Sequence, residues 1–230
     1  MSLVRKTFKR LHYPLDVIAQ CVRWYLAYAL SLRNLEEMMA ERGIIVDHST
    51  FHRWVSRLVP LLDKAFRLHK RAVGRRWRMD EIYIKIKGQW KYLYRAVDTA
   101  GQTVDFLLSA KRDAAALRFF RKAISYHGES EVVTIDKSGA NTAALTTLNA
   151  NKPEEERMTI RQSKYLNNLV EQDHRNIKRR SRAMLGFKSF RRAQTILAGI
   201  ELIHMIRKGQ YTHPQSQSLS PADSFYLLVA

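Results

Sequence analysis

The sequence predicts a helical N-terminal domain followed by an α/β domain built on a mixed sheet. Apolar residues recur every three or four positions through residues 14–59, whereas apolar and polar residues alternate only from Asp80 onward. Residues 64–78 lie between these patterns and carry seven Lys or Arg and no acid, as expected of a basic linker. The expected domains are therefore 1–63 (helical), 64–78 (linker), 79–208 (α/β) and 209–230 (a tail ending in a short helix).

Turn and capping residues divide the first domain into three helices. Pro14 is suited to the first turn of a helix, and Ser31 can cap the N-terminus of a second helix that stops near Gly43. Asp47 can cap a third helix, and Pro60 disfavours its continuation. Short helices joined by a Gly-containing turn are typical of a helix-turn-helix unit, whose last helix contacts DNA. Its outward polar residues include the expected DNA contacts His48, Ser49, His52, Arg53 and Arg57.

The second domain begins with three predicted strands, at residues 80–87, 90–97 and 103–108. Helix 113–126, strand 131–136, a helix to about residue 148 and a weak strand 158–161 follow. Helices at about 166–182 and 191–207 complete the domain. A meander of three strands followed by helix, strand, helix, strand and helix is the order of a ribonuclease-H-like domain, with a mixed five-stranded sheet flanked by helices.

The charge of the chain points to a polyanionic partner. The formal net charge is +19 and the pI is near 10.3, which is typical of proteins that bind nucleic acid or an anionic membrane. Residues 17–32 are the only segment resembling a membrane span, and Gln20 and Arg23 favour a buried helix there instead. A single cysteine, Cys21, excludes an intramolecular disulfide and a Cys-based zinc cluster. We therefore expect a soluble protein of a reducing compartment that binds nucleic acid and no membrane.

Three acidic residues have the spacing of a nuclease metal site. Asp80 shares a strand face with isoleucines, where a carboxylate is costly unless it is paired or binds a cation, although a position near the strand end could also expose it to solvent. Asp136 follows a short apolar strand, where open α/β sheets bind ligands, and a helix N-cap is an equally good interpretation. Glu171 follows Asp136 with 34 residues between them. Residues 161–192 around it hold ten Lys or Arg and only one other acid, Asp173.

The helix that carries Glu171 presents one polar stripe. Asn167, Glu171, His174 and Lys178 follow helical spacing, and a solvated face would look the same. The functional interpretation is that Glu171 completes the metal site while the rest of the stripe holds DNA. Oxygen ligands favour two Mg²⁺ ions about 4 Å apart, with Mn²⁺ able to substitute. The remaining basic residues expected at DNA phosphates are Arg75, Arg76, Arg179 and Arg180.

Several stretches of the chain resemble bacterial insertion-sequence transposases, most closely the insertion-sequence-six family of DDE transposases. The resemblance covers about residues 15–208. Its motifs are Val46 to Val55, Met79-Asp80-Glu81, Tyr92 to Asp98, Val104-Asp105-Phe106, Asp136-Lys137, Tyr165 to Lys178 and Leu185 to Ser189. The chain departs from the family pattern at Ile82, where relatives usually carry Thr.

The resemblance implies a ribonuclease-H-like catalytic fold with Asp80, Asp136 and Glu171 as the metal-binding triad and Lys178 as a substrate contact. It also implies recognition of terminal inverted repeats, replicative transposition through a cointegrate, a homodimer or larger synaptic complex on double-stranded DNA, and a place at the nucleoid in a bacterial cytoplasm. Two alternatives compete with a transposase. A helix-turn-helix regulator without catalysis does not need the triad, and a ribonuclease or resolvase needs little sequence readout from an N-terminal domain.

Overall fold

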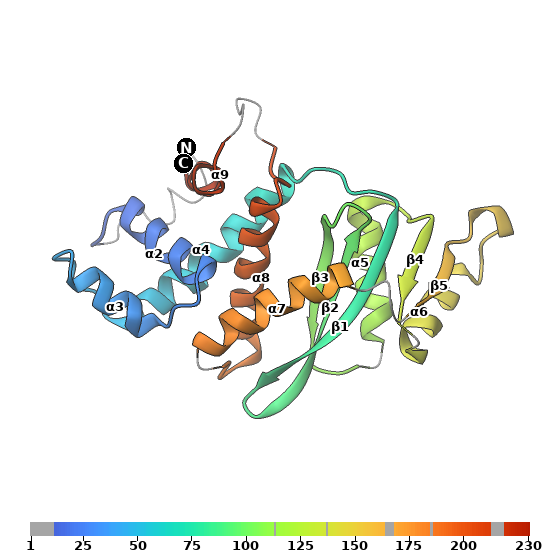
Figure 1. Cartoon of the computed structure of the whole chain (residues 1–230), viewed down its shortest axis with the longest axis horizontal. Helices are drawn as coiled ribbons and strands as arrows, with labels where there is room; N and C mark the ends of the chain where they lie inside the picture. The colour runs from blue at the N-terminus through green and yellow to red at the C-terminus, as the bar shows by residue number, and fades with distance from the viewer. Residues whose placement is uncertain (1–11, 113, 137, 164–167, 185, 213–218) are drawn as a thin grey trace. The chain divides into compact units, whose positions relative to one another are not determined.

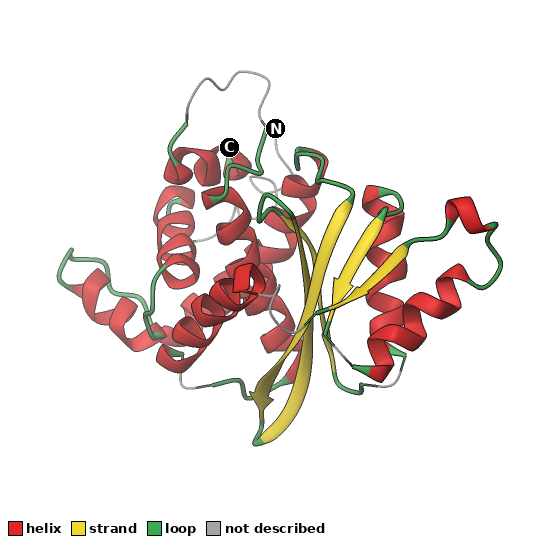
Figure 2. Ribbon diagram, turned by 45° about the vertical axis from the view of Figure 1, so that its right-hand side comes forward, coloured by secondary structure: helices red, strands yellow, loops and turns green. Residues whose placement is uncertain are grey.

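The computed structural model describes residues 12–112, 114–136, 138–163, 168–184, 186–212 and 219–230, with the backbone alone at 168–173. The chain divides into two compact units. One comprises residues 1–71 and 177–230 and is helical, and the other comprises residues 72–176 and contains the sheet (Figures 1 and 2). Each unit has its own buried residues and is described separately.

The helical unit begins with α2 (Leu15–Ala27), α3 (Leu32–Ala40) and α4 (His48–Leu68). Both predicted caps are present: the Ser31 hydroxyl accepts a hydrogen bond from the Asn34 amide (3.1 Å), and the Asp47 carboxylate accepts one from Ser49 (2.7 Å). Gly43 has a φ of +72°, the left-handed conformation predicted for the end of the second helix. The three helices and the turn before α4 therefore form as the sequence predicts.

The predicted end of the third helix at Pro60 is wrong, because α4 continues to Leu68. Proline removes the hydrogen bond to the carbonyl four residues earlier, but Ser56 and Pro60 both lie on the exposed side, where water can reach that carbonyl. Leu62 and Phe66 are fully buried and extend the apolar stripe past the proline. The predicted linker 64–78 is correspondingly shorter, since its first residues are helical and its last residues belong to a strand.

Helix α8 (Phe190–Arg207) was expected in the α/β domain, and the structure places it in the helical unit instead. A Cβ at Gly199 would lie 2.6 Å from a methyl group of Leu26 on α2 and 3.1 Å from one of Val59 on α4. The three helices are thus packed as closely as a glycine allows. Helix α9 (Pro221–Val229) also belongs to this unit, and the Ser220 hydroxyl caps it by accepting from the Asp223 amide.

The sheet unit has five strands in the order β3-β2-β1-β4-β5. They are β1 (Arg76–Ile86), β2 (Gln89–Asp98), β3 (Thr103–Ser109), β4 (Val132–Ile135) and β5 (Thr159–Gln162). The first three pair antiparallel, while β1, β4 and β5 pair parallel, so the sheet is mixed. The remaining elements are α5 (Ala115–His127), α6 (Gly139–Asn149), the short 3₁₀ helix η1 (Glu154–Glu156) and α7 (Asn168–Ala183), of which residues 168–176 belong to this unit. This is the predicted ribonuclease-H-like order.

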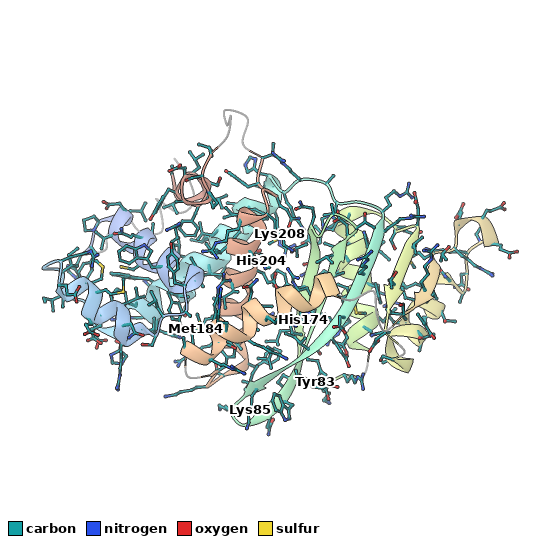
Figure 3. The ribbon with its side chains drawn as sticks, in the orientation of Figure 1. Tyr83, Lys85, His174, Met184, His204 and Lys208 are labelled. Carbon is teal, nitrogen blue, oxygen red and sulfur yellow. The ribbon has the colours of Figure 1, made fainter. Side chains whose placement is uncertain are left out.

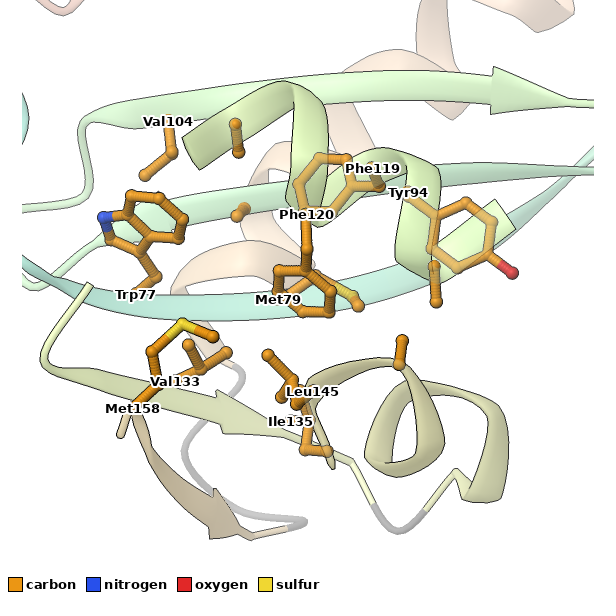
Figure 4. Close-up of a cluster of buried hydrophobic side chains, with 14 of the residues drawn as sticks. Trp77, Met79, Tyr94, Val104, Phe119, Phe120, Val133, Ile135, Leu145 and Met158 are labelled. Carbon is orange, nitrogen blue, oxygen red and sulfur yellow. The ribbon is translucent and has the colours of Figure 1, made fainter. Parts of the chain in front are cut away.

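One face of the sheet holds the core of the unit (Figure 4). Trp77 and Met79 of β1 pack there with Val133 of β4, against Phe119 of α5 and Leu145 of α6. Strand residues alternate between faces, so Asp80 and Ile82 point to the opposite face, as the sequence predicts. The two helices therefore cover one face and leave the candidate catalytic residue Asp80 on the other.

Candidate active site

Asp80 and Asp136 lie at neighbouring positions of two adjacent parallel strands. The last paired residues of β1 and β4 are Arg78 and Thr134, and each aspartate follows two residues later. Paired positions in a parallel ladder share a face, and adjacent strands are about 4.8 Å apart. The strand register therefore brings the two backbone positions together, although 55 residues lie between them in the sequence.

The Asp136 carboxylate is held by the loop that follows β4. Its Oδ1 accepts hydrogen bonds from the Ser138 amide (3.1 Å) and from the Asn141 side-chain amide (3.0 Å). The N-cap residue of α6 is Ser138, so the helix-cap interpretation of Asp136 is wrong. The Asp136 carboxylate instead holds the loop before α6 through Oδ1, while Oδ2 takes no part in these two bonds and can face a cation.

Helix α7 contacts Asp80 through His174. The His174 Nδ1 lies 3.6 Å from Asp80 Oδ2, and the two side chains are 6% and 20% exposed. Figure 3 shows His174 on α7. Glu171 precedes His174 by three residues on this helix, so the two positions share a helix face, while the Glu171 side chain lies outside the described residues. The predicted triad requires this face of α7 to lie next to Asp80.

A second group of side chains connects the two aspartate-bearing segments. Arg112 forms a close ion pair with Glu81, the residue after Asp80, and also donates to the Ser138 hydroxyl (3.2 Å) beside Asp136. The Glu81 side chain is 5% exposed. Burial opposes the charge of Arg112, yet the neighbouring Glu81 carboxylate outweighs it and raises the Arg112 pKa. Burial and the Glu81 charge also raise the pKa of Tyr94, the cross-strand neighbour of Glu81.

Sequence reasoning did not identify Arg112, Glu81 or Asn141 as site residues. Arg112 and Glu81 are 31 residues apart, and their contact depends on where the loop after β3 returns to β1. The only sequence signals were the acidic neighbour of Asp80 and an arginine just after a predicted strand. Both features are common in sequences, so they do not predict an ion pair unless the fold is known.

The structure leaves most of the expected DNA-binding residues at the surface. His48, Ser49, Arg53 and Arg57 on α4, Arg75 and Arg76 near the start of β1, and Lys178 and Arg179 on α7 are exposed. His52 is partly buried, and burial together with the charge of Arg192 lowers the pKa of its imidazole. Asn167 lies outside the described residues.

Two expected DNA contacts are instead buried. His174 is 5% exposed and lies beside Asp80, so its side chain is not presented at the surface for a DNA contact. Arg180 is 2% exposed, and burial, followed by the charges of Arg207 and Arg179, lowers its pKa to about 10. A surface contact between Arg180 and phosphate does not fit this burial. The sequence placed His174 on the polar stripe and Arg180 among the phosphate contacts, and the sequence pattern does not show what packs against either residue.

Glu36, Asp47 and His48 form a cluster at the surface. In the described part of the chain it is the one group of three or more His, Cys, Asp or Glu residues whose ligand atoms all lie close enough to hold a metal ion. The His48 Nδ1 lies 3.4 Å from Glu36 and 3.2 Å from Asp47. Asp47 already caps α4, and its pKa is lowered mainly by its hydrogen bonds with Ser49. Helix capping and an exposed ion pair account for this cluster.

The fold and the site define a class of protein: a ribonuclease-H-like domain with adjacent strand aspartates and a helix carrying a glutamate. A family model described as "DDE domain" matches residues 74–210. The transposase of the insertion sequence-like element IS431mec of Staphylococcus aureus is 37% identical over 225 residues, covering 97% of this chain and 98% of the relative. The transposase of element IS257 in transposon Tn4003 of the same species matches to the same extent.

The chain belongs to the DDE transposases of the insertion-sequence-six family, enzymes that cleave DNA. Solved structures with a similar fold include the integrase catalytic core of HTLV-2 with magnesium, which is 17% identical. It covers 58% of this chain and 88% of its own, with a TM-score of 0.44. The BIV integrase core is 15% identical and covers 67% and 95%, with a TM-score of 0.41.

The residues at the site fit the divalent metal that this family uses. Asp80 and Asp136 offer carboxylate oxygens, the ligands that hard cations such as Mg²⁺ prefer.

No helix in the described residues is long and apolar enough to cross a membrane.

Proposed function

We propose that this transposase binds the terminal inverted repeats of its own insertion sequence, cleaves a strand at each end and joins the freed 3′-OH to target DNA. The observation that carries the proposal is the β1–β4 register, which puts Asp80 and Asp136 side by side, with α7 in contact at His174. Replicative transposition through a cointegrate, and a dimer or larger synaptic complex at the nucleoid of a bacterial cell, complete the proposal.

Asp80, Asp136 and Glu171 would hold two Mg²⁺ ions, with Mn²⁺ as a substitute. When bound, the ions lower the pKa of an attacking water or hydroxyl and stabilise the leaving oxygen of the phosphodiester. His174 packs against Asp80 and restricts its carboxylate, while Asn141 restricts that of Asp136. Lys178 is exposed on α7, two turns after the position of Glu171, and can pair with a DNA phosphate near the cleaved bond.

The helix-turn-helix of α3 and α4 would read the repeat sequence. Ser49, Arg53 and Arg57 are exposed on α4, and the helix is anchored by the buried Phe51, Val55 and Leu58. A helix of this kind places its N-terminal residues against base edges in the major groove. The fixed cap at Asp47 defines where that helix begins and which residues it presents.

Replacing Glu171 with Gln separates binding from chemistry. The full-length variant should shift labelled element-end DNA on a gel as the wild type does, because the helix-turn-helix is unchanged. Binding should weaken steeply with salt, since Lys and Arg displace counterions. The variant should neither nick nor join the DNA at any Mg²⁺ concentration, because a neutral amide is a poor ligand for a hard cation.

The exposed Glu154→Gln on η1 is the matched control and should keep wild-type activity. Strand transfer by Glu171→Gln at the wild-type rate would show that the catalytic assignment is wrong and would direct attention to Asp173. A wild-type protein that binds the element end but never cleaves it would favour the alternative function, a helix-turn-helix regulator without catalysis.

A further inference from the structure

The β1–β2 hairpin carries an exposed aromatic surface that the proposed site does not use. We define the hairpin tip as residues 82–92. Trp90 is 60% exposed and Tyr83 47% exposed, and Figure 3 shows Tyr83 and Lys85 on the hairpin. Trp54 and Trp77 are buried at 3% and 2%, whereas Trp90 is exposed because β1 and β2 extend beyond the core.

The tip has a rigid turn and two different faces. Lys87 and Gly88 both have positive φ, 49° and 78°, as a two-residue type I′ turn requires, and this turn matches the twist of the strands. Ile82, Ile84 and Ile86 alternate on one face and are 3–6% exposed. The aromatic residues lie on the other face, where Tyr83 and Trp90 are exposed and Tyr92 is partly buried against the core. The pairing register of β1 and β2 therefore places Trp90 on the exposed face of the hairpin.

The aromatic rings form a connected surface with a cation beside them. The Tyr83 and Trp90 rings are 6.5 Å apart at 84°, and those of Tyr83 and Tyr92 are 5.5 Å apart. Lys85 Nζ lies 5.7 Å from the Trp90 ring centroid. The tip, residues 82–92, contains three Lys and no acid, so the surface is complementary to a polyanion.

We propose that the hairpin tip binds unpaired nucleotides of the DNA substrate, with Trp90 stacking on a base and Lys85 pairing with a phosphate. Aromatic side chains stack on bases of any sequence, and nearby lysines follow the backbone. The base must be unpaired, because inside a duplex both of its faces are already stacked on neighbours. Tyr83 follows Asp80 by three residues, about 10 Å along the strand, and its side chain points to the opposite face of the sheet. An unpaired strand that leaves the cleavage site would therefore reach the aromatic rings by passing around the hairpin tip.

This inference rests on the proposed function, because it assumes that the chain acts on DNA. The test measures binding by fluorescence anisotropy for the full-length protein on two probes. One is a blunt element-end duplex, and the other is the same duplex with unpaired nucleotides beyond the cleavage position. The wild type should bind the second probe more tightly. Trp90→Ala should weaken that binding about 5- to 150-fold, the range for losing one base stack, and leave blunt-duplex binding unchanged.

Two further variants address the fold of the hairpin. Trp90→Phe keeps a ring and should keep most of the preference for unpaired DNA. Lys85→Gln should reduce the slope of log affinity against log salt by about 0.7 on the unpaired probe. Tyr126→Ala removes an aromatic residue that is 58% exposed on α5 and should bind both probes as the wild type does.

Equal affinity of the wild type and Trp90→Ala for the unpaired probe would overturn the inference, and so would equal losses for Trp90→Ala and Tyr126→Ala. A change in molecular mass on light scattering without a change in DNA binding would make the tip a contact between copies of the chain and would also overturn it. All of these outcomes leave the proposed function intact. Failure of the wild type to bind either probe would refute the proposed function itself.

Discussion

Replacing Arg112 with Met should destabilise the sheet unit and impair catalysis. The substitution removes the ion pair with Glu81 and the hydrogen bond to Ser138, and it leaves a carboxylate that is only 5% exposed without its cation. Breaking a buried pair costs about 3–5 kcal/mol, but Arg112 is 41% exposed, so water can partly replace it. We expect a loss of about 2–3 kcal/mol in the free energy of unfolding, or about 4–12 °C in the melting temperature.

Catalysis should respond differently from stability in this variant. Arg112 holds the neighbours of Asp80 and Asp136, so its loss should raise the Mg²⁺ concentration needed for half-maximal nicking by about 10- to 100-fold. Calorimetry and nicking assays across a Mg²⁺ series measure the two effects. Arg118→Met, which removes the contact with Ser109, is the matched control.

Adding Glu81→Gln to Arg112→Met should restore most of the lost stability, because no buried charge is then unpaired. The double variant should still need more Mg²⁺ than the wild type for half-maximal nicking, since the hydrogen bond to Ser138 is still missing. Wild-type stability together with a wild-type Mg²⁺ requirement in Arg112→Met would refute the reasoning.

Two more predictions concern the helical unit. Gly199→Val should destabilise this unit by about 1–3 kcal/mol in thermal unfolding, because any Cβ at that position meets Leu26 and Val59. Gly139→Ala is the control and should be neutral, because the space around Gly139 is open. Equal melting temperatures of the two variants would argue against the close packing of α8. Arg53→Ala should cost about 1–3 kcal/mol of discrimination between repeat and random DNA in competition binding, and an equal loss on both DNAs would show a phosphate contact instead.

Local patterns were sufficient to predict most of the elements. Strict alternation from Asp80 predicted the faces of β1, and the caps at Ser31 and Asp47 lie where the sequence placed them. These features depend on residues within a few positions of one another. The aspartate candidates could be recognised for the same reason, because each lies at a recognisable place along a strand.

Features that depend on distant packing could not be predicted. Pro60 is a helix breaker by local rules, and α4 continues past it because Leu62 and Phe66 have a core to enter. The sequence of α8 does not reveal its packing partners either, because the helix is apolar on most of its circumference. The burial of Arg180 likewise follows from its packing and not from its polar surroundings in sequence.

The surroundings of Asp80 show how the fold restricts a costly group. An acid in the middle of a strand needs a cation or polar partners, and the structure supplies polar partners. Arg95 is its cross-strand neighbour on β2, His174 approaches from α7, and its own Oδ1 accepts from the following amide. Ile82 is 6% exposed two residues further along the same face. His174 and the Glu81 amide therefore restrict the Asp80 carboxylate, and position 82 carries an aliphatic packing residue.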